Sequence, residues 1–318
     1  MTKKVKVAIV GAGYMASEHL KAFEATGEAQ VVGITSRTRE RAQALVADHE
    51  GIEVFDSLEV MYEKTRADIV VVTVTELHMA DVAKRCFEFP WLVLLEKPAG
   101  YNLADARDIQ QAAHAKKARV HVALNRRAYS STRQALDVLK GNEGPRFIKV
   151  LDQQDQHAAL TIHNNPPLMV ENYMFANSIH LIDYLRVLGR GEVVSVENIV
   201  KWDPAAPGIV LASITFSSGD TGLYEGVWNG PGPWVITVNT PDNRLEMRPL
   251  EQVSVQLKGE RRSQALDIEE ADSLYKPGLL FQAQQAILAS QGQANVLPDI
   301  DDSFKSMELV ASIFNMDG

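Results

Sequence analysis

A glycine-rich segment near the start of the sequence has the residue types and spacing of a diphosphate-binding turn. Residues 11–16 read GAGYMA and lie between an apolar run, 5–10, and a helical pattern. Glycine at the first position permits a tight turn, glycine at the third lets the main chain approach a diphosphate, and the free N–H groups of the following helix bind phosphate oxygens. A plain tight turn is the alternative. The candidate cofactor-binding residues here are Gly11, Gly13, Tyr14 and Met15.

The residues after the second apolar run indicate which dinucleotide is bound. An NAD site usually has a carboxylate there, which accepts hydrogen bonds from the adenosine ribose. This sequence instead has Ser36, Arg37 and Thr38. A guanidinium group matches the geometry of a phosphate, and the two hydroxyls add further donors. We therefore predict NADP(H) in preference to NAD(H); the alternative is that Arg37, with Arg39 and Arg41, belongs to a solvated basic face.

A lysine at the end of a buried apolar run has a position suited to catalysis. Glu96, Lys97 and Pro98 follow the run 92–95. Doubly wound sheets bind ligands at the carboxyl ends of their strands. An ammonium group there stabilises negative charge that develops on oxygen during hydride transfer. We interpret Lys97 as catalytic, the alternative being an exposed lysine paired with Glu96.

A second polar group with suitable chemistry lies on a predicted helix, 170–188. Spacing of three and four residues puts Tyr173, Asn177, His180 and Tyr184 on one face of that helix, which we expect to line the substrate cleft. The ordinary pKa of histidine, about 6.5, suits His180 to exchange a proton with a substrate hydroxyl. A structural histidine is the alternative.

The elements that position these residues change character along the chain. Strands and helices alternate in the first third, which predicts βαβ units and a doubly wound parallel sheet. The predicted strands there are 5–10, 31–35, 69–73, 92–95 and 120–124, with helices at 15–26, 39–49 and 103–116.

Later strands are joined by short turns, which predicts antiparallel pairing. We therefore expect an α/β protein: a Rossmann domain, 1–124, and a C-terminal α/β domain, 125–318, with a largely antiparallel sheet open on one face. The predicted later strands are 147–154, 193–202, 210–216, 221–228, 234–240, 244–249 and 253–257, with helices at 131–140, 170–188, 279–289 and 302–315.

Five short motifs, in this order, resemble the glucose-fructose oxidoreductase, inositol dehydrogenase and MocA-like family. They are residues 11–16, 73–78 (TVTELH), 96–98 (EKP), 125–127 (NRR) and 178–183 (SIHLID). The resemblance covers essentially the whole chain. It implies hydride exchange with a sugar, polyol or related carbonyl compound, a cis bond before Pro98, and a C-terminal sheet that mediates dimer or tetramer contacts.

The sequence departs from the family pattern next to the histidine. The family usually has an aspartate four residues before it and a glycine two before it, where this chain has Ala176 and Ser178. The missing carboxylate removes a group that would assist His180 or bind a substrate hydroxyl. Asn177 and Asp183 are the candidates to bind substrate in its place, and Tyr173 is an alternative acid.

Further candidates lie beside the expected cofactor. Thr73 ends the third strand of the Rossmann pattern, His78 follows it, and His78 is a candidate to pack beside the dinucleotide. Asn125 and Arg126 follow its last strand and are candidates to line the junction of cofactor and substrate, with a structural cap as the alternative. Asp152, Asp155, His157 and His163 could suggest a metal site, but their spacing fits no metal-ligand template, so we expect no metal.

Composition excludes several classes of function. The net charge of −9 argues against a nucleic-acid partner, because phosphate neutralisation needs a basic face. The longest apolar run, 89–95, is far shorter than the roughly 20 residues that span a bilayer. A single cysteine, Cys86, is typical of a reducing compartment, so we expect a cytoplasmic protein.

Two functions of different classes remain. The first is an NAD(P)-dependent dehydrogenase or reductase that acts on a hydroxyl or carbonyl group, with Lys97 at the substrate oxygen and His180 at the proton. The second is a dinucleotide-binding sensor or regulatory protein without turnover. This hypothesis rests on Ala176, which stands where the family usually has an aspartate. A recycled, internally bound nicotinamide is a weaker third hypothesis.

Overall fold

The computed structural model describes residues 4–316, which pack into two compact units. The first unit comprises the chain up to Ala128 together with Ala271–Phe304, and the second comprises Tyr129–Glu270 together with the chain from Lys305 on. The predicted domain division after residue 124 stays a prediction. By packing, the late segment Ala271–Phe304 belongs with the first unit, because its helix packs on the Rossmann core.

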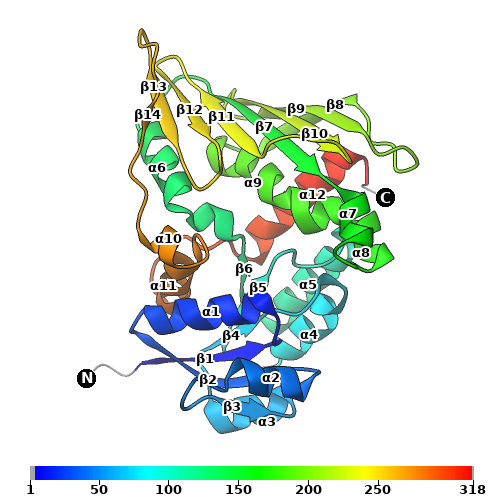
Figure 1. The fold of residues 1–318 in the computed structure, drawn as a ribbon, viewed down its shortest axis with the longest axis vertical. Helices are drawn as coiled ribbons and strands as arrows, with labels where there is room; N and C mark the ends of the chain where they lie inside the picture. Colours follow the sequence, from blue (N-terminus) through cyan, green and yellow to red (C-terminus); the bar gives the residue numbers. More distant parts are fainter. Residues whose placement is uncertain (1–3, 317–318) are drawn as a thin grey trace. The chain divides into compact units, whose positions relative to one another are not determined.

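The first unit contains a six-stranded sheet in the order β3-β2-β1-β4-β5-β6, and all its pairs are parallel (Figure 1). This is the Rossmann order, and the prediction of a doubly wound sheet is confirmed. The strand order reverses between β1 and β4, which makes the crevice at their carboxyl ends the expected ligand site. The strands are β1 Val5–Val10, β2 Ala29–Thr35, β3 Glu53–Phe55, β4 Ile69–Val72, β5 Leu92–Glu96 and β6 Arg119–Ala123.

Helices bury both faces of this sheet, which is why all residues of β4 are apolar and buried. Leu20 and Phe23 of α1 share one apolar cluster with Ala283 and Ile287 of α11, and Figure 1 shows these two helices side by side. The helices of this unit are α1 Tyr14–Ala25, α2 Arg39–Leu45, α3 Leu58–Thr65, η1 Glu76–His78, α4 Met79–Cys86, α5 Leu103–Lys116, η2 Asn125–Ala128, α10 Ala271–Leu274 and α11 Leu279–Ser290.

The second unit contains an eight-stranded sheet in the order β14-β13-β12-β11-β7-β10-β9-β8. All pairs are antiparallel except β7 with β10, which run parallel, so the prediction of a largely antiparallel sheet is confirmed. The strands are β7 Phe147–Gln154, β8 Val193–Val200, β9 Ile209–Phe216, β10 Thr221–Trp228, β11 Val235–Asn239, β12 Asn243–Met247, β13 Ser254–Leu257 and β14 Gln264–Ala265.

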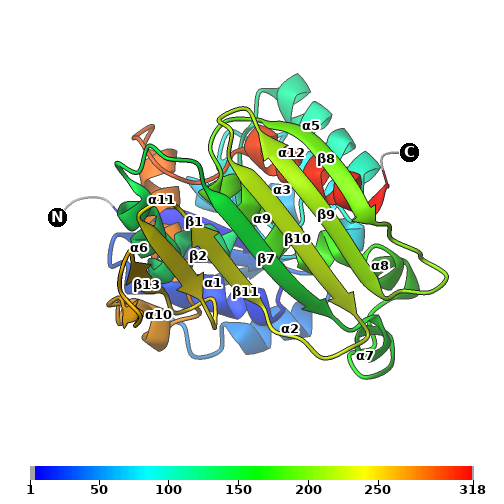
Figure 2. The same cartoon turned by 90° about the horizontal axis from the view of Figure 1, so that it is seen from above.

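One face of this sheet is covered and the other is open. Every second residue of β7, β9 and β10 is buried against helices, whereas the intervening residues are half-buried or exposed. Figure 2 looks onto the strands from the uncovered side. The remaining helices are α6 Ser130–Leu139, α7 Gln156–Thr161, α8 Pro167–Glu171, the π-helix η3 Met174–Ser178, α9 Ile179–Leu188 and α12 Ile300–Phe314, within which the division of the units falls.

The prediction of one continuous helix over 170–188 is wrong, because the chain forms α8, the π-helix η3 and α9 there. A π-helix has more residues per turn than an α-helix and shifts the faces of the elements on either side. The expected polar face is therefore divided. Tyr184 is buried, and its hydroxyl lies 2.8 Å from Oγ1 of Thr132 in the core of the unit.

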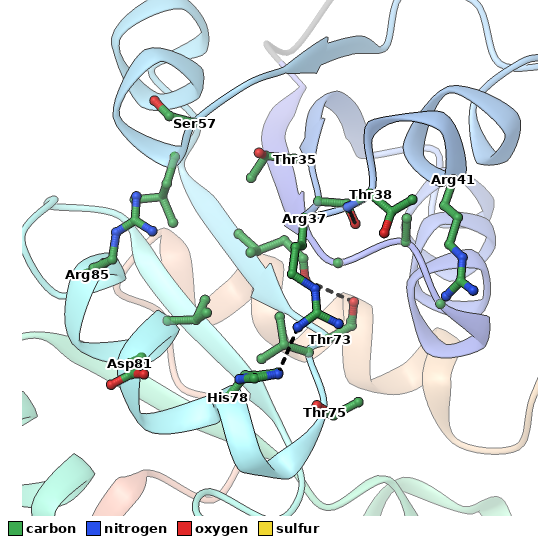
Figure 3. Close-up of a pocket in the computed structure, with 18 of the residues that line it drawn as sticks. Thr35, Arg37, Thr38, Arg41, Ser57, Thr73, Thr75, His78, Asp81 and Arg85 are labelled. Carbon is green, nitrogen blue, oxygen red and sulfur yellow. Dashed lines mark hydrogen bonds between the residues drawn. The ribbon is translucent and has the colours of Figure 1, made fainter. Parts of the chain in front are cut away.

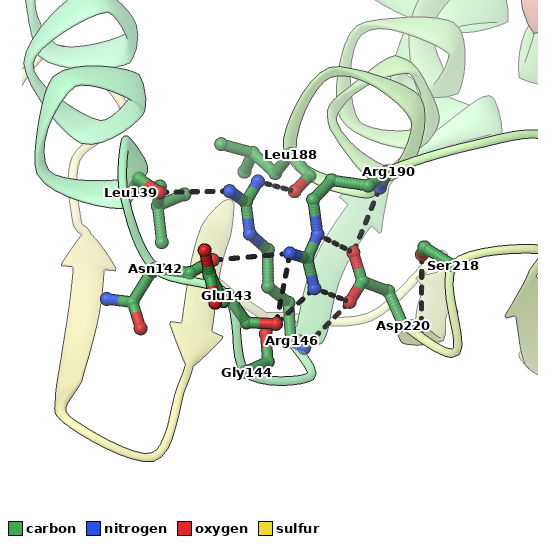
Figure 4. Close-up of polar contacts among 9 residues, drawn as sticks. All are labelled: Leu139, Asn142, Glu143, Gly144, Arg146, Leu188, Arg190, Ser218 and Asp220. Carbon is green, nitrogen blue, oxygen red and sulfur yellow. Dashed lines mark hydrogen bonds and ion pairs between the residues drawn. The ribbon is translucent and has the colours of Figure 1, made fainter.

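A buried carboxylate joins several elements of the second unit (Figure 4). Asp220 has no exposed surface and accepts hydrogen bonds from the backbone N–H groups of Arg146 and Arg190 and from the guanidinium of Arg190. The Arg146 guanidinium donates to the carbonyl oxygens of Leu139 and Leu188, at the C-terminal ends of α6 and α9. These contacts fix the helix ends to the turn before β10.

No helix among residues 4–316 combines the length and apolar character required to cross a lipid bilayer.

Candidate functional site

The glycine turn connects β1 to α1 and has the geometry that a diphosphate requires. Gly11 has φ +110°, and a Cβ there would lie 2.5 Å from Oγ1 of Thr73, so the fold itself requires this glycine. A Cβ on Gly13 would meet nothing within 4 Å. Glycine at this third position of the turn therefore leaves open space beside the first N–H groups of α1, which is where the diphosphate of a dinucleotide fits.

A cavity of about 530 Å³ opens beside this turn, at the carboxyl ends of β1, β2 and β4 (Figure 3). Most of the predicted cofactor residues near the turn line it, and so do several that the sequence analysis did not single out. Its lining includes the predicted Gly11, Gly13, Ser36, Arg37, Thr38, Thr73 and His78, and also Arg41, Ser57, Asp81 and Arg85.

The arginines that line the cavity differ in whether a carboxylate pairs with them. The Arg85 guanidinium donates to Glu59 at 2.8 Å, which partly neutralises it, whereas no carboxylate among the described residues pairs with Arg37 or Arg41. One guanidinium nitrogen of Arg37 lies 3.0 Å from Nε2 of His78. This contact holds the Arg37 guanidinium against His78, beside the cavity and close to the end of β2.

Lys97 is half-buried and follows the last residue of β5. Burial lowers the pKa of its ammonium group, and the nearby cations Arg126 and Lys276 lower it further, whereas Glu96 and Glu76 act in the opposite direction. The Lys97–Pro98 peptide bond is cis, as the family resemblance implies. An ammonium group with a lowered pKa is a stronger hydrogen-bond donor to a developing oxyanion than an ordinary one, which suits the predicted role.

The carboxylate of Glu96 connects β5 to the helix that follows the glycine turn. Its Oε1 lies 2.7 Å from Nε2 of His19 on α1, and its Oε2 accepts a hydrogen bond from the N–H of Lys97. Both side chains are buried. No sequence signal indicated the contact between His19 and Glu96, because the two residues are far apart in the chain.

Asn125 and Arg126 lie in η2, directly after β6. Asn125 is buried, its Nδ2 donates to the carbonyl oxygen of Pro277, and its Oδ1 lies 3.4 Å from a guanidinium nitrogen of Arg126. The charge of Arg126 acts on Lys97. Asn125 thus has the structural contact that was weighed as the alternative, while Arg126 contributes to the positive field around Lys97.

The candidate site residues of the predicted helix 170–188 all lie in the second unit. His180 is 6% exposed at the start of α9, and its ring centroid lies 6.4 Å from that of Trp234. Asp183 is buried and accepts a hydrogen bond of 2.6 Å from the hydroxyl of Ser306. This contact directs its carboxylate toward α12, and a role for Asp183 in substrate binding stays a prediction.

Asn177 lies at the end of a chain of buried polar groups. Its Nδ2 donates to Oε1 of Gln154 at 2.7 Å, and Nε2 of Gln154 in turn donates to Asp152 at 2.6 Å. Asp152 also accepts from the hydroxyl of Tyr224. These contacts fix the orientation of the Asn177 amide. Nδ2 of Asn177 lies 3.4 Å from the Tyr173 hydroxyl.

The position of the missing family aspartate lies within the π-helix. Ala176 is 6% exposed, so the chain has a small buried methyl group there. Single-turn π-helices occur frequently at functional sites, which makes this segment a reasonable location for substrate contacts. Within residues 4–316, no group of three or more histidine, cysteine or acidic side chains is arranged to hold a metal ion.

Comparison with known proteins gives the same assignment as the motifs. Residues 5–124 match the oxidoreductase family with an NAD-binding Rossmann fold, the family of glucose-fructose oxidoreductase, inositol dehydrogenase and MocA. None of the curated proteins is similar enough in sequence to match the chain.

Solved structures of the same fold cover nearly the whole chain. A dehydrogenase from Chromobacterium violaceum has 20% identity and a TM-score of 0.83 over 98% of this chain and 94% of its own. An aldose-aldose oxidoreductase from Caulobacter crescentus, complexed with glycerol, has 16% identity and a TM-score of 0.83 over 99% and 97%. Levoglucosan dehydrogenase, in complex with NADH and levoglucosan, has 16% identity and a TM-score of 0.80 over 99% and 97%.

The family match over residues 5–124 confirms the resemblance that the motifs predicted and the predicted class of enzyme, an NAD(P)-dependent dehydrogenase. The solved structures share the fold of the chain. Over residues 5–124, this chain matches the model of the glucose-fructose oxidoreductase, inositol dehydrogenase and MocA family of oxidoreductases.

Proposed function

We propose that the protein transfers a hydride between NADP(H) and a hydroxyl or carbonyl group of a sugar, polyol or related small molecule. The observation that carries the proposal is Lys97, whose ammonium with lowered pKa follows β5 at the ligand-binding edge of the Rossmann sheet. The bound nicotinamide supplies the hydride chemistry. Two structural neighbours are named for levoglucosan and aldose reactions, which supports a sugar-type substrate.

The side chains of the protein supply orientation, charge and a proton. Lys97 donates a hydrogen bond to the substrate oxygen and stabilises the negative charge that grows on it. His180 exchanges a proton with the substrate, with the Tyr173 hydroxyl as the alternative acid. Asn177, its amide fixed by Gln154, accepts a hydrogen bond from a substrate hydroxyl. In this scheme Asn177 takes over part of the function of the aspartate that Ala176 replaces.

A panel of sugars, polyols and ketoacids, assayed with NADPH and NADP, tests the function directly. Turnover of any member supports the oxidoreductase. A sensor or regulatory protein of the same fold predicts tight dinucleotide binding without turnover, and Ala176 is the feature that favours this second candidate. Activity without net consumption of cofactor would instead identify an internally recycled nicotinamide.

The preference for NADP(H) rests on the charges of the cavity beside the glycine turn. Arg37 and Arg41 line it without a carboxylate partner among residues 4–316, and Ser36 adds a hydroxyl at the end of β2. A phosphate on the adenosine ribose would neutralise these cations, whereas the bare ribose of NAD(H) would meet no carboxylate acceptor at the end of β2.

Replacement of both Ser36 and Arg37 by alanine tests this preference. The Kd for NADPH is expected to rise about 30-fold, because charge-assisted contacts to phosphate are lost, and the Kd for NADH is expected to change less than about threefold. Fluorescence titration of the reduced cofactors gives both values. Arg262→Ala, at an exposed position of the second unit, is the control. Equal effects on the two cofactors would contradict the preference.

We also propose that the protein forms a homodimer or homotetramer through the open face of its eight-stranded sheet. Light scattering of the purified protein is expected to give a mass of two or four chains of 35.1 kDa. Leu223→Glu, on the half-buried, outward-facing side of β10, is expected to reduce that mass because it puts a charge into the interface. A monomeric wild-type protein at micromolar concentration would contradict the proposal.

A further inference from the structure

The loop between α10 and α11 brings a lysine to the glycine turn. The ammonium nitrogen of Lys276 lies 5.2 Å from the ring centroid of Tyr14. Tyr14 is the first residue of α1 and directly follows Gly13. A cation over an aromatic face is held by the charge distribution of the ring, so this contact keeps the ammonium near the start of α1.

Hydrogen bonds on both sides of Lys276 fix the loop that carries it. The N–H of Gly278 donates to the side chain of Asp272 at 2.7 Å, and Gly278 itself has φ +79°, a conformation that favours glycine. The carbonyl oxygen of Pro277 accepts a hydrogen bond from Nδ2 of Asn125. The position of Lys276 is therefore set by the Rossmann unit and is not that of a mobile surface side chain.

Lys276 belongs to a group of three cations. Its charge and that of Arg126 both lower the pKa of Lys97, which means that each of these two cations repels the ammonium group of Lys97. Of the two acids that act on Lys97, Glu96 already contacts His19. Glu76 offsets part of this charge, so three cations face two acids, and in a chain with net charge −9 the remaining local excess of positive charge indicates an anionic ligand.

The ligand with matching charge is the diphosphate of the dinucleotide. It carries two negative charges, and the open space at Gly13 and the free N–H groups of α1 are next to Tyr14. We propose that Lys276 binds the cofactor through its diphosphate, adding a side-chain cation to a site otherwise made of main-chain amides. The inference rests on the proposed function, because it requires that the chain binds NADP(H) or NAD(H).

Calorimetric titration of the full-length chain with NADPH and with NADH tests this inference. Lys276→Met is expected to raise the Kd about tenfold for both cofactors, because both contain the diphosphate. Lys276→Arg keeps the charge and is expected to stay within about threefold. Lys64→Met is the matched control, since Lys64 is an exposed lysine at the end of α3. Melting temperatures of the cofactor-free variants establish that each one is folded.

Two fragments locate the contact. Lys276→Met is expected to weaken 2′-phospho-ADP-ribose, which contains the diphosphate, and to leave adenosine 2′-phosphate, which lacks it, unchanged. The same variant is expected to show a smaller dependence of Kd on salt, because one cation fewer meets the ligand. A folded Lys276→Met variant with unchanged Kd values, or one that weakens both fragments equally, would overturn the inference alone. A wild-type chain that binds neither dinucleotide would overturn the proposed function as well.

Discussion

Replacement of Lys97 by methionine is expected to lower kcat about a thousandfold, with the substrate found in the panel, while the Kd for NADPH changes less than about threefold. Methionine has a similar length but cannot donate a hydrogen bond or carry charge. The lost interaction is one that strengthens as negative charge grows on the substrate oxygen, so turnover suffers more than binding. Stopped-flow single turnovers and fluorescence titration measure the two effects separately.

The pH dependence of the reduction gives an independent test of the same residue. Burial and nearby cations lower the pKa of Lys97, so its ammonium loses the proton at a lower pH than an ordinary lysine. The rate of carbonyl reduction is therefore expected to fall as the pH rises through this lowered pKa. Lys97→Arg, whose guanidinium stays charged, is expected to move this fall in rate to higher pH. A methionine variant with unchanged turnover would refute the catalytic role.

Replacement of Asp220 by asparagine is expected to lower the free energy of unfolding by about 3 kcal/mol at pH 7. The two carboxylate oxygens accept four hydrogen bonds from N–H groups of Arg146 and Arg190. An asparagine amide puts two N–H donors of its own against this set of donors. It also leaves the Arg190 guanidinium without its counter-charge.

The sign of the pH effect follows from the pKa of Asp220. Burial alone would raise this pKa, yet the hydrogen bonds from Arg190 and from the two backbone N–H groups lower it to about 2, below the ordinary 3.8. The carboxylate therefore adds about 2 kcal/mol of stability above pH 4, which is lost as the pH falls toward 2. The difference between wild type and Asp220→Asn is expected to shrink over that range.

Urea unfolding followed by tryptophan fluorescence measures this stability, because Trp202, Trp228 and Trp234 all lie in the second unit with Asp220. Asp137→Asn is the control. Asp137 forms an exposed ion pair with Lys140 on the same unit, and its loss is expected to change stability by less than about 0.5 kcal/mol. Equal effects of the two variants would show that the cluster around Asp220 contributes no more than a surface pair.

Local sequence signals were sufficient for several of the regular elements, whereas β3 and α3 were not predicted. The helix α5 and the strands β7 and β10 have the predicted bounds. Asn102 caps α5 through its side chain, and strict alternation of buried and outward residues marks the two strands. The glycine turn was also predictable, because its chemistry depends on neighbouring residues within one strand, turn and helix.

Features that depend on distant contacts were not predictable. The π-helix at Met174–Ser178 has no sequence signature distinguishable from a continuous helix, since both are mainly apolar. The parallel pairing of β7 with β10 joins strands that no short turn connects. The contact of His19 with Glu96 and the position of Lys276 beside Tyr14 both require the folded chain. The part of the candidate site that depends on neighbouring residues was therefore predicted. The part that depends on contacts between residues distant in the sequence was not.

The discontinuity of the first unit has a consequence for biosynthesis. A nascent chain emerges from the ribosome N-terminus first, at about 5–20 residues per second, so β1–β6 leave the exit tunnel well before α11. Until α11 has been translated, the apolar side of α1 around Leu20 and Phe23 lacks its covering helix. The newly made nucleotide domain thus stays aggregation-prone through most of translation, and a chaperone that shields α1 during this interval would raise the yield of native enzyme.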